Sequence, residues 1–541
     1  MAKAEKKRAS RLEYQSQYQL VIPGFEMPFE KHLNPENRWV VLAKTIPWDR
    51  MVNIYVRKMG KSNFGTSKIN PRMVLGALII KHYMGYTDRE TVEMIRENVY
   101  MQYFVGLSSF SHEAIFDASL FVTIRKRLEE SAANEINELV IKYWKEQEEK
   151  KEEKRKEASK TKTDQGEGKE EDSEGKIKKE EVTQNVQKGE IKEKEEEKEE
   201  EKEEEKEEQN DHQGTLIIDA TACPQAIAYP TDIKLLNECR EHLEGIIDSF
   251  HAYMAGKKGE EKVKKPRTYR EEARAQFLKI AQDKNPGVKK IRKGVRKQLN
   301  YIKRNFRHID KYLQEVKMGE VLSAKQHNYL LRIDLIYSQQ LEMYKERKHK
   351  VEDRIVNLHQ PYVRPIVRGK LPNKVEFGAK IQLSLTDKGF CYLDHMSWDA
   401  FNEGQYLKDS VEKYKTRHGY YPKEVLADKI YCNRENRAWL KEKNIKLKAK
   451  PLGRPKALSN HVSPGERNPI EGKIGQAKLA YGLNRIPAKL SATSKSWIAS
   501  IILVLNLVKL AGLSAYCLLL SWICASIYPQ GRARFNAELS F

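Results

Sequence analysis

The sequence predicts an α/β protein with a mainly helical N-terminal part. Apolar residues recur at helical spacing through much of residues 1–144. Residues 145–212 are almost entirely Glu and Lys with a few small polar residues. From residue 213 onward, short apolar runs alternate with helical patterns, which is the order of an α/β fold. We therefore expect an all-α domain at 1–144, a disordered linker at 145–212 and an α/β domain at 213–541.

The composition favours an acidic polymer as the partner. The 541 residues carry a net charge of +22 although the linker is rich in Glu, so the folded parts are more basic than the total. Nucleic acid fits this balance better than a membrane surface, while a basicity that only aids solubility is the plainer alternative. Six cysteines without a CxxC pair indicate a reducing cytosol and no zinc site. The N-terminus lacks the apolar stretch of a secretion signal, so we expect a cytoplasmic protein.

The N-terminal part predicts three helices. The first spans about 71–83, and Thr87 with Glu90 forms a capping box that begins the second. The third, 116–128, carries a cluster of cations. This arrangement fits either a helix-turn-helix DNA reader or an ordinary helical bundle with a solvated basic patch, and both stay open. The cations that would contact DNA are Arg125 and Arg127.

The Lys/Glu segment cannot bury an apolar core. It is either a tether between a DNA-binding module and a second module, or a passive spacer.

Two aspartates each close a short apolar run. Thr215 to Ala220 is rich in β-branched residues and contains Asp219, and Asp428 follows the run 425–427. Burying the Asp219 charge costs several kcal/mol unless the carboxylate is paired or binds a metal ion. The alternative for Asp219 is a turn-forming residue.

The sequence predicts a helical hairpin at about residues 240–360, inserted into the α/β domain. Val288, Val295, Ile302 and Ile309 repeat every seven residues, as in a coiled-coil seam. The outer side of this helix carries many charged residues. Such residues usually lie on a solvated face, but here positive charges dominate, which favours contacts with phosphate groups. The hairpin could also clamp DNA or support a dimer. The candidate DNA-binding residues on it are Lys293, Arg296, Lys297, Lys303 and Arg304.

The next segments complete the α/β order. Residues 375–385 and 390–394 flank a turn containing Gly389 and predict a β-hairpin. Residues 401–414 predict a helix, and 433–442 predict another after the strand at 425–427.

A carboxylate-bearing helix follows. Asn468 suits the N-cap and Pro469 the first helical position, which puts Glu471 in the first turn. Glu471 is then either the third residue of a capping box or a functional carboxylate. Gly475 and Gly482 share its face with Lys478, and glycines that weaken a helix there indicate that something bulky approaches.

The apolar stretch at about 495–528 is long enough to cross a bilayer. Asn506 and Lys509 lie within it, and such residues disfavour a membrane span. We expect buried helices that pack on the sheet.

Three dispersed motifs resemble the DDE transposases of bacterial insertion sequences, in the insertion-sequence-five family. They are Asp219-Ala-Thr221 with Tyr229-Pro-Thr-Asp232, Ala427-Asp-Lys-Ile-Tyr431, and Arg467-x3-Glu471-x6-Lys478 with Tyr481-Gly-Leu483. The resemblance covers most of residues 20–145 and 213 to about 510. The chain departs from the family pattern at Ala220 and Ile430, where glycines are expected, and at Pro464, where a tyrosine often stands.

This resemblance implies an RNase H-like catalytic domain. Asp219, Asp428 and Glu471 would be the catalytic carboxylates and would hold two Mg²⁺ or Mn²⁺ ions around a scissile phosphate. Arg467 and Lys478 would bind flanking phosphates or position Glu471. The expected reaction is cleavage and strand transfer at the terminal inverted repeats of the element, on double-stranded DNA, by a homodimer or higher assembly in the cytoplasm of a bacterium. The alternatives are an inactive or co-opted DNA-binding protein and a simple metal-dependent nuclease.

Overall fold

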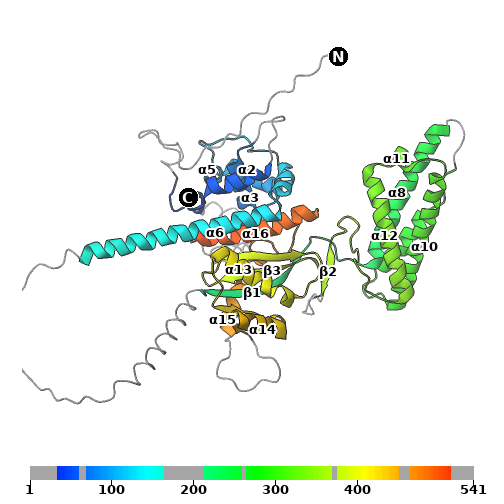
Figure 1. Cartoon of the computed structure of the whole chain (residues 1–541). Coiled ribbons are helices and arrows are strands. Elements are labelled where there is room, and N and C mark those ends of the chain that lie inside the picture. Colours follow the sequence, from blue (N-terminus) through cyan, green and yellow to red (C-terminus); the bar gives the residue numbers. More distant parts are fainter. Residues whose placement is uncertain are drawn as a thin grey trace, which may run out of the picture.

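The computed structural model describes residues 33–59, 69–163, 212–258, 264–367, 375–449 and 464–512. Figure 1 shows a group of N-terminal helices above two long helices, a sheet beneath these, and a helical lobe that projects to one side. The mixed α/β class that the sequence predicts is confirmed.

The N-terminal helices begin where the sequence provides caps. Asn70 accepts a hydrogen bond from the Arg72 amide ahead of Pro71, and Thr87 and Glu90 form the expected capping box. The predicted helix start at Pro71 and the predicted capping box are therefore confirmed. The helices are α1 (Arg38–Thr45), α2 (Trp48–Met59), α3 (Pro71–Met84), α4 (Asp88–Glu97) and α5 (Val99–Phe104).

One long helix, α6 (Leu120–Thr163), joins the N-terminal helices to the rest of the molecule. It starts at Leu120 rather than Phe116, bends at Glu129, whose φ is 38°, and packs along α16 (Ser491–Leu510). The domain boundary expected at residue 144 falls inside this helix. The N-terminal helices, α16 and the inner face of the sheet share one apolar core, so they form a single folded unit. The remainder of the expected linker, 164–211, lies outside the described residues.

The sheet has the order β2-β3-β1-β5-β6, with β4 also paired to β3. β1 runs antiparallel to β3 and parallel to β5, and β3 and β4 form the predicted hairpin around Gly389 at φ 71°. Because β1 is longer than the sequence indicates, Asp219 lies in the middle of the strand, not at its end. The strands are β1 (Thr215–Pro224), β2 (Arg364–Val367), β3 (Val375–Thr386), β4 (Cys391–Ser397), β5 (Glu424–Leu426) and β6 (Lys446–Lys448).

The helices that flank the sheet agree with the sequence only in part. α14 (Arg434–Glu442) confirms the helix predicted at 433–442, and Asn433 is its N-cap. The helix expected at 401–414 is instead divided into a 3₁₀ turn, η1 (Glu403–Tyr406), and α13 (Leu407–His418). A second 3₁₀ turn, η2 (Lys429–Tyr431), follows β5.

The start predicted for the carboxylate helix is wrong. α15 spans Pro464–Leu479, so Pro469 lies inside it and Glu471 is in its third turn. A proline at the sixth position removes the hydrogen bond to the carbonyl of the second residue and crowds that carbonyl, which weakens the first turns of α15. The capping-box interpretation of Glu471 therefore falls away.

The apolar helix α16 is buried within the protein. It is long and apolar enough to cross a membrane, yet 78% of its apolar window is buried. Asn506 fits this environment because its side-chain nitrogen donates to Asn137 (2.8 Å) and to the Cys391 carbonyl (2.7 Å), while its oxygen accepts from the Cys391 amide (2.9 Å). These bonds satisfy the outer edge of β4 at that residue. The rest of the predicted apolar stretch, from 513, lies outside the described residues.

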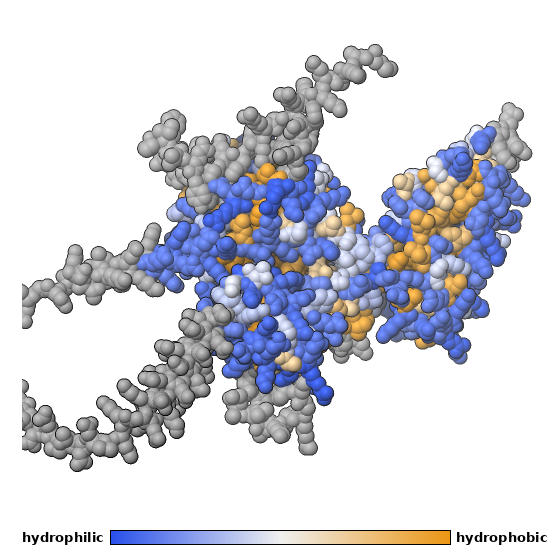
Figure 2. All heavy atoms as spheres, in the orientation of Figure 1, coloured by the Kyte–Doolittle hydropathy of each residue, from blue (hydrophilic) through white to orange (hydrophobic). Residues whose placement is uncertain are grey.

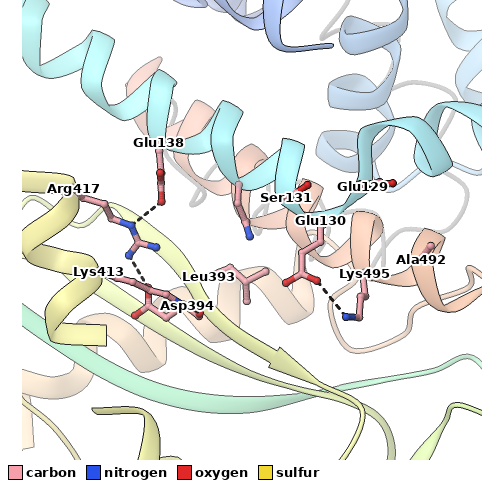
Figure 3. A pocket seen from close by; sticks show the side chains of 11 residues that line it. Glu129, Glu130, Ser131, Glu138, Leu393, Asp394, Lys413, Arg417, Ala492 and Lys495 are labelled. Carbon is pink, nitrogen blue, oxygen red and sulfur yellow. Dashed lines mark hydrogen bonds and ion pairs between the residues drawn. The ribbon is translucent and has the colours of Figure 1, made fainter. Parts of the chain in front are cut away.

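Ion pairs reinforce the contact between α6 and the sheet. Arg417 on α13 donates to Glu138 on α6 (2.8 Å) and to the buried Asp394 on β4 (2.6 Å), and Lys495 on α16 pairs with Glu130 (3.5 Å). Figure 3 shows these residues lining a pocket of about 570 Å³ between the four elements. Since the charged groups of this pocket mostly pair with one another, we regard it as a structural joint.

The insertion is a bundle instead of the expected two-helix hairpin. It begins at residue 232, earlier than predicted, and has its own apolar core. Val295, Leu299, Ile302 and Ile309 are buried as the heptad pattern predicts, whereas Val288 is 82% exposed. The helices are α8 (Asp232–Lys258), α9 (Arg270–Ala281), α10 (Val288–Leu313), α11 (Met318–Val321) and α12 (Ala324–Glu346), and α10 packs mainly on α8.

Candidate active site

Asp219 is placed by the central strand β1 and is 19% exposed. Its Oδ1 accepts a hydrogen bond from the Ala220 amide at 2.8 Å, which fixes the carboxylate orientation. Burial raises the pKa of Asp219 above its ordinary value, and the Ala220 hydrogen bond and the Arg467 charge oppose this shift. A carboxylate in this state gains from a nearby cation.

Asp428 lies beside Asp219 because of the strand register. β1 and β5 are parallel neighbours, with Ile217 opposite Leu426, so each aspartate stands two residues beyond this pair. Asp428 is also the N-cap of η2, and its Oδ1 accepts from the Lys429 amide at 2.7 Å. The sequence prediction that two strands bring these carboxylates together therefore agrees with the geometry.

Glu471 reaches the same place from α15. Ile470 and Ala477 are fully buried and pack this helix on the sheet, which confirms the apolar face predicted for it. Glu471 follows Ile470 and lies at the exposed margin of the contact.

Arg467 connects the three carboxylates. Its Nη1 lies 3.2 Å from Asp428 Oδ1, and its Nη2 lies 3.2 Å from Glu471 Oε1 and 3.7 Å from Asp219 Oδ2. The guanidinium group is 21% exposed. Three acidic side chains from distant segments thus converge on one cation. The sequence left two roles open for Arg467, phosphate binding or positioning of Glu471, and the structure shows contact with Glu471 and both aspartates.

The donor set suits a hard divalent cation. Three carboxylates on a strand, a strand end and a helix offer only oxygen ligands, which Mg²⁺ and Mn²⁺ prefer. Within the described ranges, no three His, Cys, Asp or Glu side chains are grouped closely enough to hold a metal ion as they stand. Arg467 lies among the carboxylates, so cation binding would require this guanidinium to move and the carboxylates to come closer together.

Three further residues beside the triad were missed from the sequence. Glu403 on η1 acts electrostatically to raise the pKa of Asp219, and it pairs with Lys380 of β3 at 2.8 Å. The Tyr431 hydroxyl is buried without a hydrogen-bond partner among the described residues, and burial, Glu403 and Asp219 raise its pKa. Tyr431 closes one of the motifs, but Glu403 and Lys380 have no local signature.

The DNA-binding role predicted for Arg125 is wrong. Its side chain is buried at 5% exposure, donates to both carboxylate oxygens of Asp88 (2.9 and 2.8 Å), and lies 5.1 Å from the ring of Trp497. It therefore ties α6 to α4 and α16. Arg127 is exposed, and its DNA contact stays a prediction.

Lys478 lies near the sheet rather than among the three carboxylates. It is half-buried on α15, and its charge partly offsets the effect of burial, which raises the pKa of Cys223 on β1 to about 12. The predicted cations of α10 belong to the separate bundle.

Two comparisons with known families bear on this site. Residues 27–127 match a family model described as a transposase domain. Residues 425–508 match a model described as a transposase DDE domain, and this range contains Asp428, Arg467 and Glu471. Over these two ranges the chain is similar to the insertion-sequence DDE transposases. The resemblance seen in the motifs is thereby confirmed, while the insertion-sequence-five branch stays a prediction.

The similarity of this chain to individual known proteins is limited. An uncharacterized protein, ORF8 in the nfe locus of Rhizobium meliloti, is 36% identical over 99 residues, which is 18% of this chain and 45% of that protein. The chain thus spans about half the length of that curated relative. No solved structure matches the chain significantly. Asp219 and the helical insertion lie outside both family matches.

Proposed function

We propose that this chain is an active DDE transposase that cuts and joins DNA at the ends of its own insertion sequence. The observation that supports this proposal is the convergence of Asp219, Asp428 and Glu471 on Arg467. The parallel β1–β5 pair at the centre of a mixed sheet is compatible with an RNase H-like domain. Because two element ends must be brought together, the active form would be a dimer or larger assembly on double-stranded DNA.

The three carboxylates would hold two Mg²⁺ or Mn²⁺ ions. When bound, these ions supply an activated hydroxyl and a stabilised leaving oxygen in phosphoryl transfer. The chain supplies the positioning: the Ala220 amide orients Asp219 and the Lys429 amide orients Asp428. A hydroxyl freed at an element end would serve as the nucleophile for joining to the target.

Arg467 would have two successive partners in this cycle. In the unloaded protein its guanidinium neutralises the three carboxylates. Once cations take over that role, the guanidinium is free to form a bidentate contact with a phosphate beside the break. Lys478, about three turns beyond Arg467 along α15, would contact the same strand.

The test is cleavage and joining by the full chain on a duplex that ends in the terminal repeat of the element. Asp219→Asn, Asp428→Asn and Glu471→Gln should each abolish Mg²⁺- or Mn²⁺-dependent cleavage while DNA binding persists. Asp409→Asn, an exposed carboxylate on α13, is the matched control and should cleave normally. Cleavage that survives in the three site variants would refute the proposal.

A second candidate is a co-opted DNA-binding protein without activity. It is favoured by Ala220 and Ile430 at positions where the family pattern has glycine. This candidate predicts binding without cleavage by the unaltered chain. Cleavage without joining to a target plasmid would instead indicate a simple nuclease.

A further inference from the structure

The outer face of α10 carries a continuous row of polar, mostly cationic side chains. Its positions are spaced three or four residues apart, so they stack along one side of the helix. All seven are exposed, and six of them are Lys or Arg. The row consists of Lys289, Lys293, Arg296, Asn300, Lys303, Arg307 and Lys311.

The opposite face of α10 fixes the orientation of this row. Val295, Leu299, Ile302 and Ile309 are buried in the bundle core, where α10 packs on α8. The row therefore cannot turn inward without losing that core. Figure 2 shows hydrophilic side chains covering the outer edges of the lobe.

Neighbouring cations of α10 that lie off the row are engaged within the bundle. Lys290 pairs with Asp283, Arg292 donates to the Tyr344 carbonyl at 3.0 Å, and Arg304 stacks 4.5 Å from the Tyr269 ring. The contact predicted between Arg304 and DNA is thus disfavoured, because this side chain already has an aromatic partner. Lys297 is half-buried and beside the row.

The cations at the centre of the row differ from these neighbours. Over the described ranges of the chain, no carboxylate forms an ion pair with Lys293, Arg296 or Lys303. Like charges at this spacing destabilise a helix by a few tenths of a kcal/mol per pair. An unneutralised row of this length is unfavourable for the fold alone, which points to an external polyanion.

We propose that the row on α10 binds the phosphate backbone of double-stranded DNA without reading its sequence, as a second DNA contact apart from the catalytic carboxylates. From Lys289 to Lys311 the row is about 33 Å long at 1.5 Å per residue. One turn of B-DNA is about 34 Å, so the row matches one helical turn. Lysine and arginine contacts to phosphate release counterions and carry no base information. The proposal rests on the proposed function only for the identity of the polyanion.

The experiment measures binding of the full chain to a 40-bp duplex of unrelated sequence by fluorescence anisotropy. EDTA is present throughout, so cleavage cannot contribute. A triple variant, Lys293→Gln, Arg296→Gln and Lys303→Gln, is compared with a control that removes three exposed lysines elsewhere in the bundle. The control is Lys279→Gln, Lys325→Gln and Lys345→Gln, on α9 and α12.

The row variant should lower the slope of log K against log salt concentration by about 3, close to one per phosphate contact. The control should keep the slope of the unaltered chain, and both variants should melt at the same temperature because the substituted side chains are exposed. Equal slopes for the two triple variants would overturn the proposal, as would a loss confined to single-stranded RNA. If the unaltered chain never cleaves DNA and only the row variant has a smaller salt slope, the transposase function is refuted while the proposal for the α10 row is supported.

Discussion

Replacing Arg467 by Gln separates its two proposed roles. In the unloaded protein the guanidinium contacts Asp219, Asp428 and Glu471, so any divalent cation must displace it. Gln keeps hydrogen-bonding capacity and removes the charge. If the guanidinium is a stand-in for metal, Arg467→Gln should bind Mn²⁺ more tightly in the absence of DNA.

The size of the effect follows from exposure. The Asp428 and Glu471 side chains are 53% and 60% exposed, so each pair with Arg467 is screened and contributes about 0.2–1 kcal/mol. Asp219 is less exposed but lies further from the guanidinium, at 3.7 Å. A total of about 1–2 kcal/mol corresponds to roughly a tenfold gain in Mn²⁺ affinity, since 1.4 kcal/mol is a factor of ten.

Isothermal titration of Mn²⁺ into the full chain measures this affinity directly. Arg485→Gln is the matched control, because Arg485 is exposed just beyond α15 and away from the three carboxylates. The Arg467 variant should also gain less DNA affinity on addition of Ca²⁺ than the unaltered chain, because no guanidinium is released to the phosphate. Unchanged or weaker Mn²⁺ binding would refute this reasoning and leave Arg467 as a residue that only positions Glu471.

Four other outcomes are expected. Burial lowers the pKa of His418 from 6.5 to about 4. Between these two pH values the unfolded chain binds a proton at His418 and the folded chain does not, so the free energy of unfolding falls as the pH falls from about 6.5 to about 4. His418→Gln should remove about 1–2 kcal/mol of the difference between urea unfolding at pH 7 and pH 5. Asn506→Leu should cost about 1–3 kcal/mol in the same assay, because it leaves the Cys391 amide of β4 unbonded, while the Cys391 carbonyl keeps its hydrogen bond from Asn137. Gly378→Ala should destabilise by more than about 2 kcal/mol, since an added Cβ would lie 2.1 Å from a carbonyl oxygen of β1, and a smaller loss would show that the strands adjust. Replacing residues 154–208 by a short Gly/Ser linker should leave thermal melting and DNA binding intact, and failure to fold would contradict the single-unit interpretation.

Local signals predicted the elements that depend on local chemistry. The capping box at Thr87 and Glu90, the β3–β4 hairpin and the helix α14 all occur where the sequence predicted them. Each is determined by residues only a few positions apart. The triad was predictable because its three motifs together resemble a known family, although no single motif fixes the distance between them.

Long-range contacts explain what the sequence left out. Arg125 was assigned to DNA because its partner Asp88 is 37 positions away and its aromatic neighbour Trp497 is further still. The helix α8 is an exception, because its buried apolar residues recur every three or four positions from Leu235 to Met254, so its helical pattern was present in the sequence. Glu403 joins the site through contacts between η1 and η2 that no spacing in the sequence reveals.

The same long-range contacts change the meaning of the Lys/Glu segment. Before it, Lys145 on α6 lies 2.7 Å from the His418 ring, and after it, the His212 ring stacks on Tyr421 at 5.8 Å between centroids. His418 and Tyr421 flank a single turn, so the chain leaves and re-enters the folded unit at one corner. A tether between two independent modules would instead connect separate cores, whereas here the elements on both sides contribute to one core. The segment is therefore an excursion from a single unit. Its shortening reduces loop-closure entropy by only about 1 kcal/mol, because that cost grows with the logarithm of length.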